Sequence, residues 1–425
     1  MPQHPPGRWL QPRSYHAFRC IGPQCEDTCC KGWAVSVDKL TWEAWQSCEH
    51  AELGPRLREL VTIDPAGSGG DTFARIALTG ADCPFLTGGL CEIHATLGEE
   101  HLSTVCASYP RVASIVDGVL QRSLALSCPE AARLMLLDPA PMEFDEEEGP
   151  QIQRRALRIA RLTTAEDNGP KPYGYFHGIR AFVIWLLQYR ACSVWKRLVI
   201  LASFCDRLHA LAPAHSQTPR LIEEYRAIVA GNLFDSVLAN LPPRPALQLE
   251  LVLELIVQRI GSDIAPARFL ESYREFMQGI EWTSQSSMDD IGARYANAFS
   301  SDYAPFMAGH EYMLEHLLVA CVHRTLFPLG PQEQARESAE NPPPESIRDQ
   351  CLMLLVHYAI IQTVLIGVAA FHKEAFAAEH VVKVVQSSTK AFDHSQSFPA
   401  AALRLLAKKG VNNCAALALL LRMQV

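Results

Sequence analysis

The sequence has no long apolar run, and this limits where we expect the chain to work. No stretch reaches the roughly 18 consecutive apolar residues of a membrane-spanning helix. The longest candidates, Ala181–Leu187 and Leu198–Phe204, are flanked by basic residues and are typical of core helices. Met1–Arg13 is rich in proline and lacks the apolar stretch of a secretory signal. We therefore expect no membrane partner and a cytoplasmic location.

The sequence also lacks a basic excess and a standard nucleotide-binding motif. Lys and Arg number 38 against 46 Asp and Glu, so the net charge is −8 and the pI is near 6.0. Phosphate binding needs a basic surface, so we expect no nucleic-acid partner. No Gly-x-Gly-x-x-Gly joins a strand to a helix; Gly67–Gly70 precedes strand-like sequence and indicates a loop. A Rossmann-type cofactor domain is therefore not predicted.

Cysteine is scarce overall but strongly clustered. The chain has 14 cysteines in 425 residues, well below the roughly 8–10% of a disulfide scaffold. Nine lie in the first 128 residues, and only five are spread over the remaining 297. Cys48 falls in a helical pattern, whereas the other eight lie in turn-rich sequence. Because cytosolic thiols stay reduced, this clustering indicates a metal or redox centre rather than disulfides.

The pattern along the chain predicts a mainly α protein with two parts. Residues 1–14 read as a loose arm, and residues 15–140 as a cysteine-rich α+β module with short strands, hairpins and helices. Asp117-Gly118 predicts a type I′ turn between the strands 112–116 and 119–126. The acidic run Asp145–Glu148, followed by Gly149-Pro150, marks the boundary to a helical domain over 150–425. Pro331–Ser346 reads as a surface loop or linker.

Helical periodicity dominates the second part. We predict helices over 151–164, 174–190, 193–210, 218–239, 246–260, 265–277, 286–299, 303–326, 346–369, 373–391, 398–408 and 411–423.

The eight clustered cysteines have the chemistry of a metal centre. An iron–sulfur cluster needs four thiolates converging from loops and turns, and a structural zinc ion also takes four ligands. Seven residues separate Cys83 from Cys91, which is not a zinc-knuckle spacing, so an iron–sulfur centre is favoured and zinc is the alternative. Eight thiols exceed the four that one centre needs, so some are packed thiols or ligands of a second ion. The candidate ligands are Cys20, Cys25, Cys29, Cys30, Cys83, Cys91, Cys106 and Cys128.

The short motif of radical enzymes that cleave S-adenosylmethionine is incomplete. Such an enzyme commonly shows Cys-x3-Cys-x2-Cys, but here Gly32 stands at the third position after Cys25 and Cys29. A radical mechanism would therefore need ligands from distant segments.

Three N-terminal segments resemble the flagellin lysine-N-methylase family. They are Phe18–Trp33, Gly89–Arg111 with its Cys106-Ala-Ser-Tyr-Pro-Arg motif, and Ser123–Arg133. The same cysteine order is similar to that of small proteins described as zinc- or iron-chelating. The resemblance is specific over about residues 15–138 and looser over Glu311–Pro328 and Gly367–His394.

The resemblance implies a methyltransferase that uses S-adenosylmethionine to methylate lysine side chains of flagellin. It also implies a 4Fe-4S cluster held by N-terminal cysteines, without telling which four are ligands. Two alternatives stay open: a non-catalytic metal-binding or interaction protein, and a redox or metal-handling protein.

Such a reaction suggests residues for the cofactor site, but the catalytic residues stay unknown. Aromatic faces attract a sulfonium or ammonium, so Trp33 and Tyr109 are candidates. Arg111 is a candidate partner for the methionine carboxylate of the cofactor, although a strand-anchoring role is the alternative. Weaker candidates are the aromatic residues Tyr173, Tyr175, Phe176, Trp282, Tyr303 and Tyr312, the pair Asp393-His394 as base or ligand, and His94 and His101 as ligands replacing a thiolate.

Overall fold

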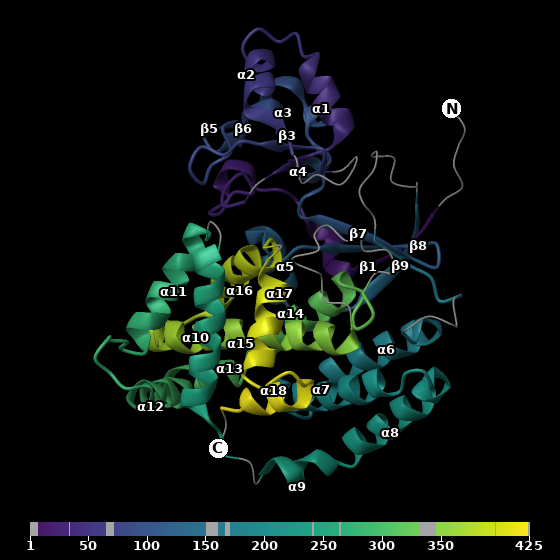
Figure 1. Cartoon of the computed structure of the whole chain (residues 1–425), viewed down its shortest axis with the longest axis vertical. Coiled ribbons are helices and arrows are strands. Elements are labelled where there is room, and N and C mark those ends of the chain that lie inside the picture. Colours follow the sequence, from purple (N-terminus) through teal and green to yellow (C-terminus); the bar gives the residue numbers. More distant parts are fainter. Residues whose placement is uncertain are drawn as a thin grey trace.

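A computed structural model describes residues 7–33, 35–64, 72–149, 160–165, 171–239, 242–262, 265–330, 346–395 and 397–423. Figure 1 shows a small N-terminal lobe standing above a large helical body, with a sheet packed at the side of that body. The predicted class, mainly α with an α+β N-terminal region, is confirmed.

The side sheet has five strands in the order β10-β7-β8-β1-β9. The predicted hairpin is confirmed: Asp117 and Gly118 have φ of 49° and 81°, as a type I′ turn requires. The sheet packs against α14 through β7 and β8. Its strands are β1 (Gly7–Pro12), β7 (Arg111–Val116), β8 (Val119–Leu124), β9 (Phe144–Gly149) and β10 (Ala160–Leu162).

Two local predictions around this sheet, the loose arm and the helix, differ from the structure. Residues 7–12, predicted as part of a loose arm, form β1, which runs parallel to β8 and antiparallel to β9. The acidic run 145–148, predicted as a boundary, lies within β9. The helix predicted at 151–164 falls partly outside the described residues, and residues 160–162 form β10. In these strands pairing outweighs local propensity, and Arg8 of β1 and Arg13 directly after it pair with carboxylates of β9.

The upper lobe holds the remaining strands around its own small core of Val37, Trp45, Leu57 and Phe85. A three-stranded sheet runs in the order β2-β4-β3, and β5 and β6 form a separate hairpin. The elements are β2 (Ser36–Val37), α1 (Lys39–Gln46), α2 (Leu53–Leu60), β3 (Val61–Ile63), β4 (Ala74–Ile76), β5 (Leu86–Thr87), β6 (Leu90–Cys91), α3 (Glu92–Leu97) and α4 (Thr104–Ser108).

The body is built from helices close to those predicted. The predicted helix 218–239 is broken by Gly231-Asn232, where Asn232 has φ of 50°. The predicted helix 303–326 follows a π-helical segment, Phe299–Tyr303, and is divided into two helices. The helices are α5 (Pro129–Leu136), α6 (Phe176–Leu187), α7 (Val194–Ala210), α8 (Thr218–Ala230), α9 (Leu233–Ala239), α10 (Pro245–Ser262), α11 (Ala267–Gly279), α12 (Met288–Ala298), α13 (Ala304–Met307), α14 (Glu311–Arg324), α15 (Ile347–His372), α16 (Ala378–Asp393), α17 (Phe398–Lys408) and α18 (Cys414–Leu420).

Helix α15 forms the centre of the body. The segment Ile347–Ala375 is long and apolar enough to cross a membrane, although it contains no unbroken apolar run of that length. Within the protein, 94% of its most apolar window is buried. It contacts α7, α10, α11, α16 and α18. Its apolarity is thus explained by helices packed on every side.

Two glycines let α11 and α15 pack closely. A Cβ added at Gly279 would lie 1.9 Å from the Gly367 carbonyl oxygen. Because that obstacle is backbone, we expect Gly279→Ala to lower the free energy of unfolding by about 1–3 kcal/mol, as overpacking does. Gly261→Ala in α10, where nothing lies within 4 Å, should be neutral or slightly stabilising. Urea denaturation of both variants checks this, and equal effects would contradict it.

His323 links α14 to β8 and makes stability depend on pH. The imidazole is buried and hydrogen-bonds through Nε2 to the Arg122 carbonyl oxygen at 2.9 Å. Burial lowers the pKa of His323 to about 4. In the unfolded chain the histidine pKa is near about 6.5, so the unfolded chain binds a proton at pH values where the folded chain does not. Stability is therefore lost as pH falls from about 6.5 towards 4.

Replacing His323 should therefore flatten this part of the pH profile. Between pH 7 and pH 5 we expect His323→Gln to lose roughly 1–2 kcal/mol less stability than the parent chain. Urea denaturation at the two pH values measures the difference. His94→Gln, at an exposed position of α3, is the control and should keep the parent's pH dependence.

Candidate functional site

Helix α16 meets the cysteine-bearing segment at a polar contact. Gln386 Nε2 donates to Asp27 Oδ2 and to the Ser127 carbonyl oxygen, both at 2.8 Å. Lys390 Nζ donates to Asp27 Oδ1 at 2.6 Å and to the Thr28 carbonyl oxygen at 3.0 Å. Gln386 and Lys390 share a helix face because they are four residues apart. This face therefore fixes the loop that carries Cys25, Cys29 and Cys30.

Next to this contact, three rings pack together and two of them contact the Ser127 hydroxyl. The Trp33 ring centroid lies 4.1 Å from that of His394 and 5.1 Å from that of Tyr109. Ser127 Oγ lies 2.9 Å from His394 Nε2 and 3.1 Å from the Tyr109 hydroxyl. Lys390 Nζ lies 5.3 Å from the Trp33 ring centroid. We call Trp33, Tyr109, Ser127, Lys390 and His394 the junction cluster.

Burial keeps two of these side chains uncharged. It lowers the pKa of His394 to about 4, so the imidazole is neutral at pH 7. It raises the pKa of Tyr109 well above its usual value, so the phenol keeps its proton. The cluster thus offers neutral ring faces beside one cation, Lys390, which is paired with Asp27.

The structure brings together two of the three predicted cofactor-binding residues. Trp33 and Tyr109 are in ring contact, but Arg111 is exposed at the start of β7, with its guanidinium 4.9 Å from the Phe18 ring centroid. That placement matches the strand-anchoring alternative. Gln386 and Lys390 were not singled out in the sequence, although polar residues four apart on an apolar helix were an available signal.

The weaker candidates lie elsewhere, apart from His394. His94 and His101 are exposed. Asp393 pairs with Arg324 and with His357, the latter at 3.5 Å. Of the other aromatic candidates, Tyr303 lines a cavity in the helical body, described below.

The eight clustered cysteines are all free thiols. A single zinc ion needs four sulfurs at about 2.3 Å from one point, and no three His, Cys, Asp or Glu side chains among the described residues could hold a metal ion in that way. A four-iron cluster bonds each thiolate to a different iron, so its sulfurs stand farther apart. Thiolates are ligands of zinc ions and of four-iron clusters alike, so the donor type is compatible with both.

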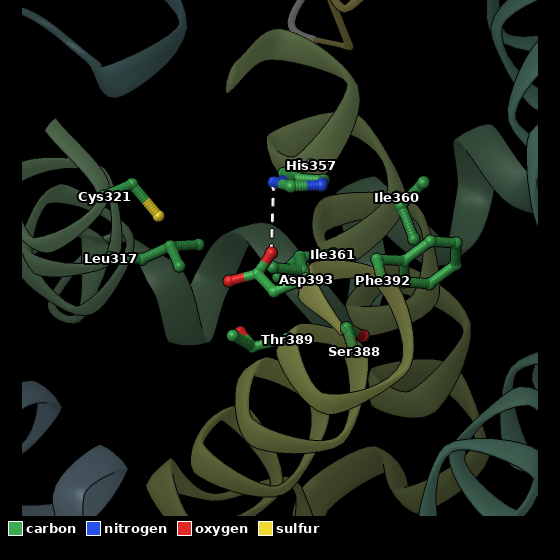
Figure 2. Close-up of a pocket in the computed structure, with 9 residues that line it drawn as sticks. All are labelled: Leu317, Cys321, His357, Ile360, Ile361, Ser388, Thr389, Phe392 and Asp393. Atoms are coloured by element: carbon green, nitrogen blue, oxygen red, sulfur yellow. Dashed lines mark ion pairs between the residues drawn. The ribbon is translucent and has the colours of Figure 1, made fainter. Parts of the chain in front are cut away.

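Two cavities lie on different faces of α15. Figure 2 shows the smaller one, into which His357 and Asp393 point from α15 and α16. Its volume of about 10 Å³ is close to that of a single water site, so it holds no cofactor. The larger cavity measures about 450 Å³ and is lined by residues that include Arg190, Trp195, Tyr303, Glu311 and Tyr358, a size that suits a small molecule.

Comparison with known proteins finds a matching family model and similar proteins. The family model described as FliB lysine N-methylase C-terminal domain matches residues 180–420. Lysine-N-methylases of Salmonella typhimurium (strain LT2) and Salmonella choleraesuis are 25% and 26% identical over 252 and 245 residues, which are 58% and 56% of this chain. The flagellar biosynthetic protein FliU of Salmonella muenchen is 32% identical over 132 residues, 30% of this chain and 77% of FliU. No solved structure matches the chain.

These matches cover only part of the chain and part of each relative. The chain spans 59% and 58% of the length of the two lysine-N-methylases. The family model includes Gln386, Lys390 and His394 but begins after the last clustered cysteine, Cys128. The junction cluster thus joins the matched region to the cysteine-bearing region before it.

Proposed function

The chain belongs to the FliB lysine N-methylase family, and on that premise we propose that it transfers methyl groups from S-adenosylmethionine to lysine side chains of flagellin. The observation that carries the proposal is the junction cluster. There, α16 of the family domain places Lys390 and His394 against Trp33 and Tyr109 of the cysteine-rich region.

The reaction forms a bond between the lysine nitrogen and the methyl carbon while the bond from that carbon to the sulfonium sulfur breaks. The ring faces of Trp33 and Tyr109 attract the sulfonium. The attacking amine must be neutral, although a free lysine has a pKa near about 10.4. Entry into the buried site and the charge of Lys390 both favour release of its proton to water beforehand. Neutral His394 adds no opposing positive charge.

We further propose that the eight clustered cysteines hold iron–sulfur chemistry, with a 4Fe-4S cluster as the unit and zinc as the alternative. Thiolates in loops and at hairpin ends are the usual ligands of such clusters. When bound, the cluster supplies either a redox centre or a charged anchor for the cofactor. Free thiols are kept in the reducing cytoplasm, which we propose as the location.

One preparation tests these proposals together. The protein is purified without oxygen, its iron and zinc are measured, and it is incubated with S-adenosylmethionine and unmethylated flagellin. Methylated lysine in flagellin by mass spectrometry supports the transferase; its absence with the metal centre intact overturns it. Zinc without iron overturns the cluster whatever the activity, and formation of 5′-deoxyadenosine identifies radical chemistry.

The role of Trp33 is tested by one substitution. We expect Trp33→Leu to lower the methylation rate about 10- to 30-fold, because a desolvated cation–π contact contributes about 2 kcal/mol. Trp282→Leu, at a partly buried tryptophan of the helical body, is the control and should keep the parent rate. Equal rates for the two variants would place the cofactor away from the junction cluster.

A further inference from the structure

The larger cavity of the helical body has an exposed rim and a buried floor. Ala191 and Ala308 at its rim are exposed to solvent. Tyr303, Tyr358 and Gln362 form the floor, and each is no more than 5% exposed. The cavity, of about 450 Å³, shares no residue with the junction cluster. It is therefore a second place at which a small group can enter the protein from solvent.

The walls of this cavity are rich in aromatic rings. The ring centroids of Phe299 and Tyr303 lie 5.5 Å apart, at an interplanar angle of 34°. Trp195 and Tyr358 line the same space from α7 and α15. The Trp195 indole N–H already donates to the Ala418 carbonyl oxygen at 2.8 Å, so the ring is what Trp195 offers to a ligand. Aromatic rings around one space attract a cation and accept an apolar stem.

A hydrogen-bond acceptor without a partner lies at the floor. Gln362 Nε2 donates to the Tyr358 hydroxyl at 3.1 Å. The Gln362 Oε1 atom is buried and accepts no hydrogen bond from the described part of the chain. Ser193 Oγ, another lining atom, is also buried and has no partner there. Because a buried acceptor without a donor is costly, the Gln362 oxygen favours a ligand that donates, and the Ser193 hydroxyl can accept as well.

Glu311 gives the cavity a carboxylate whose charge is only partly balanced. The Arg197 guanidinium lies 3.8 Å from Glu311 but 2.8 Å from Glu315. Burial raises the pKa of Glu311, so the ionised carboxylate is not fully compensated by its neighbours. The Glu311 side chain is 35% exposed, and a ligand at the rim can therefore reach it.

Arg190, the cationic residue of the lining, is engaged elsewhere. Its Nε and Nη2 atoms donate to Glu315 at 3.0 and 2.8 Å, and Nη1 donates to the Pro139 carbonyl oxygen at 2.7 Å. Among the described lining residues no cation is thus left for an anionic ligand. An ammonium, by contrast, meets a carboxylate, an amide oxygen and ring faces.

We propose that this cavity binds the ammonium group and the alkyl stem of a lysine side chain. Glu311 pairs with the ammonium, and Gln362 Oε1 accepts a hydrogen bond from it. The rings of Phe299, Tyr303 and Tyr358 pack against the apolar stem.

The role of this site is docking. Methyl transfer is assigned to the junction cluster, with which the cavity shares no residue, so the lysine held here is not the one that reacts. A protein with several lysines can place one in the cavity while another is methylated. That this protein is flagellin rests on the proposed function, whereas the binding of a lysine side chain does not.

Titration with a lysine probe tests the site without any methyl transfer. The probe is Nα-acetyl-lysine amide, and its norleucine counterpart lacks only the ammonium. In ligand-observed nuclear magnetic resonance without S-adenosylmethionine, we expect the lysine probe to bind the parent chain at least about tenfold more tightly than the norleucine probe. Equal affinities would overturn the proposal. Displacement of the lysine probe by S-adenosylmethionine would also overturn it, because the cavity would then be the cofactor site.

One substitution locates the binding. Glu311→Gln removes the charge but keeps the shape of the side chain, and we expect it to weaken binding of the lysine probe about tenfold. Glu223→Gln, at an exposed position of α8, is the control and should bind the probe like the parent. Parent affinity in Glu311→Gln would overturn the proposal. Circular dichroism checks that the variant is folded, and the comparison of the two probes on the parent decides the question if it is not.

Methylation kinetics separate this inference from the proposed function. Glu311→Gln should raise KM for flagellin more than it lowers kcat, because docking precedes the reaction. A fall in kcat at unchanged KM would overturn the docking role. A parent chain that binds the lysine probe but methylates nothing would support the lysine site and overturn only the transferase.

Discussion

Lys390→Met is expected to lower the free energy of unfolding by about 3–5 kcal/mol and to abolish flagellin methylation. The Lys390 side chain is 1% exposed, and its ammonium lies 2.6 Å from Asp27 Oδ1. Methionine fills similar space but leaves the largely buried Asp27 carboxylate without its cation, and such a loss costs about 3–5 kcal/mol. The loop that carries Cys25 and Cys29 would then lose its main attachment to α16.

Urea denaturation and the mass-spectrometric methylation assay measure the two effects. Asp27→Asn added to Lys390→Met removes the stranded charge and should recover part of the stability but not the activity. Lys409→Met is the matched control, because its carboxylate partners Glu250 and Glu254 are on the surface, where ion pairs contribute little. A Lys390 variant as stable and active as the Lys409 variant would show that the contact has no such role.

Glu315→Leu is expected to have a comparable effect on stability through a different contact. The Glu315 carboxylate is fully buried and receives Arg190 and Arg197, each at 2.8 Å. Arg197 is itself 2% exposed. Removing the carboxylate leaves the buried Arg197 guanidinium with only the more distant Glu311 carboxylate, at 3.8 Å, and we expect this loss to cost about 3 kcal/mol.

Chemical denaturation of Glu315→Leu measures this cost. The control is Glu146→Leu, which removes the partner of Arg8 from an exposed pair on β1 and β9 and should change stability very little. If the two substitutions had the same effect, the α7–α14 ion pair would not be a structural support. Because Glu315 does not belong to the junction cluster, the methylation rate of the folded fraction should stay near that of the parent.

The sequence predicted best those elements that depend on local chemistry. The Asp117-Gly118 hairpin forms because those two residues accept positive φ, and α5 begins at Pro129, whose fixed φ suits the first helical position. Helices α6, α7, α10, α11 and α17 lie within a few residues of their predicted bounds. By contrast, β1 and β9 were missed because their partners lie more than a hundred residues away in the chain, which no local pattern contains.

The candidate site, too, was predicted from the sequence only in part. By itself, the sequence determined that eight thiols gather in the first 128 residues and that Trp33 and Tyr109 stand near them, because these are facts of composition and short spacing. Only the tertiary structure decided that Gln386 and Lys390 lie beside these residues, and that His394, a weaker candidate in the sequence, is in ring contact with Trp33. It also placed Cys83 in the core of the upper lobe and Cys128 in the core of the helical body. The reason is physical: both features depend on how α16 and the two hydrophobic cores pack around one loop, and packing between distant segments leaves no periodic trace in the sequence.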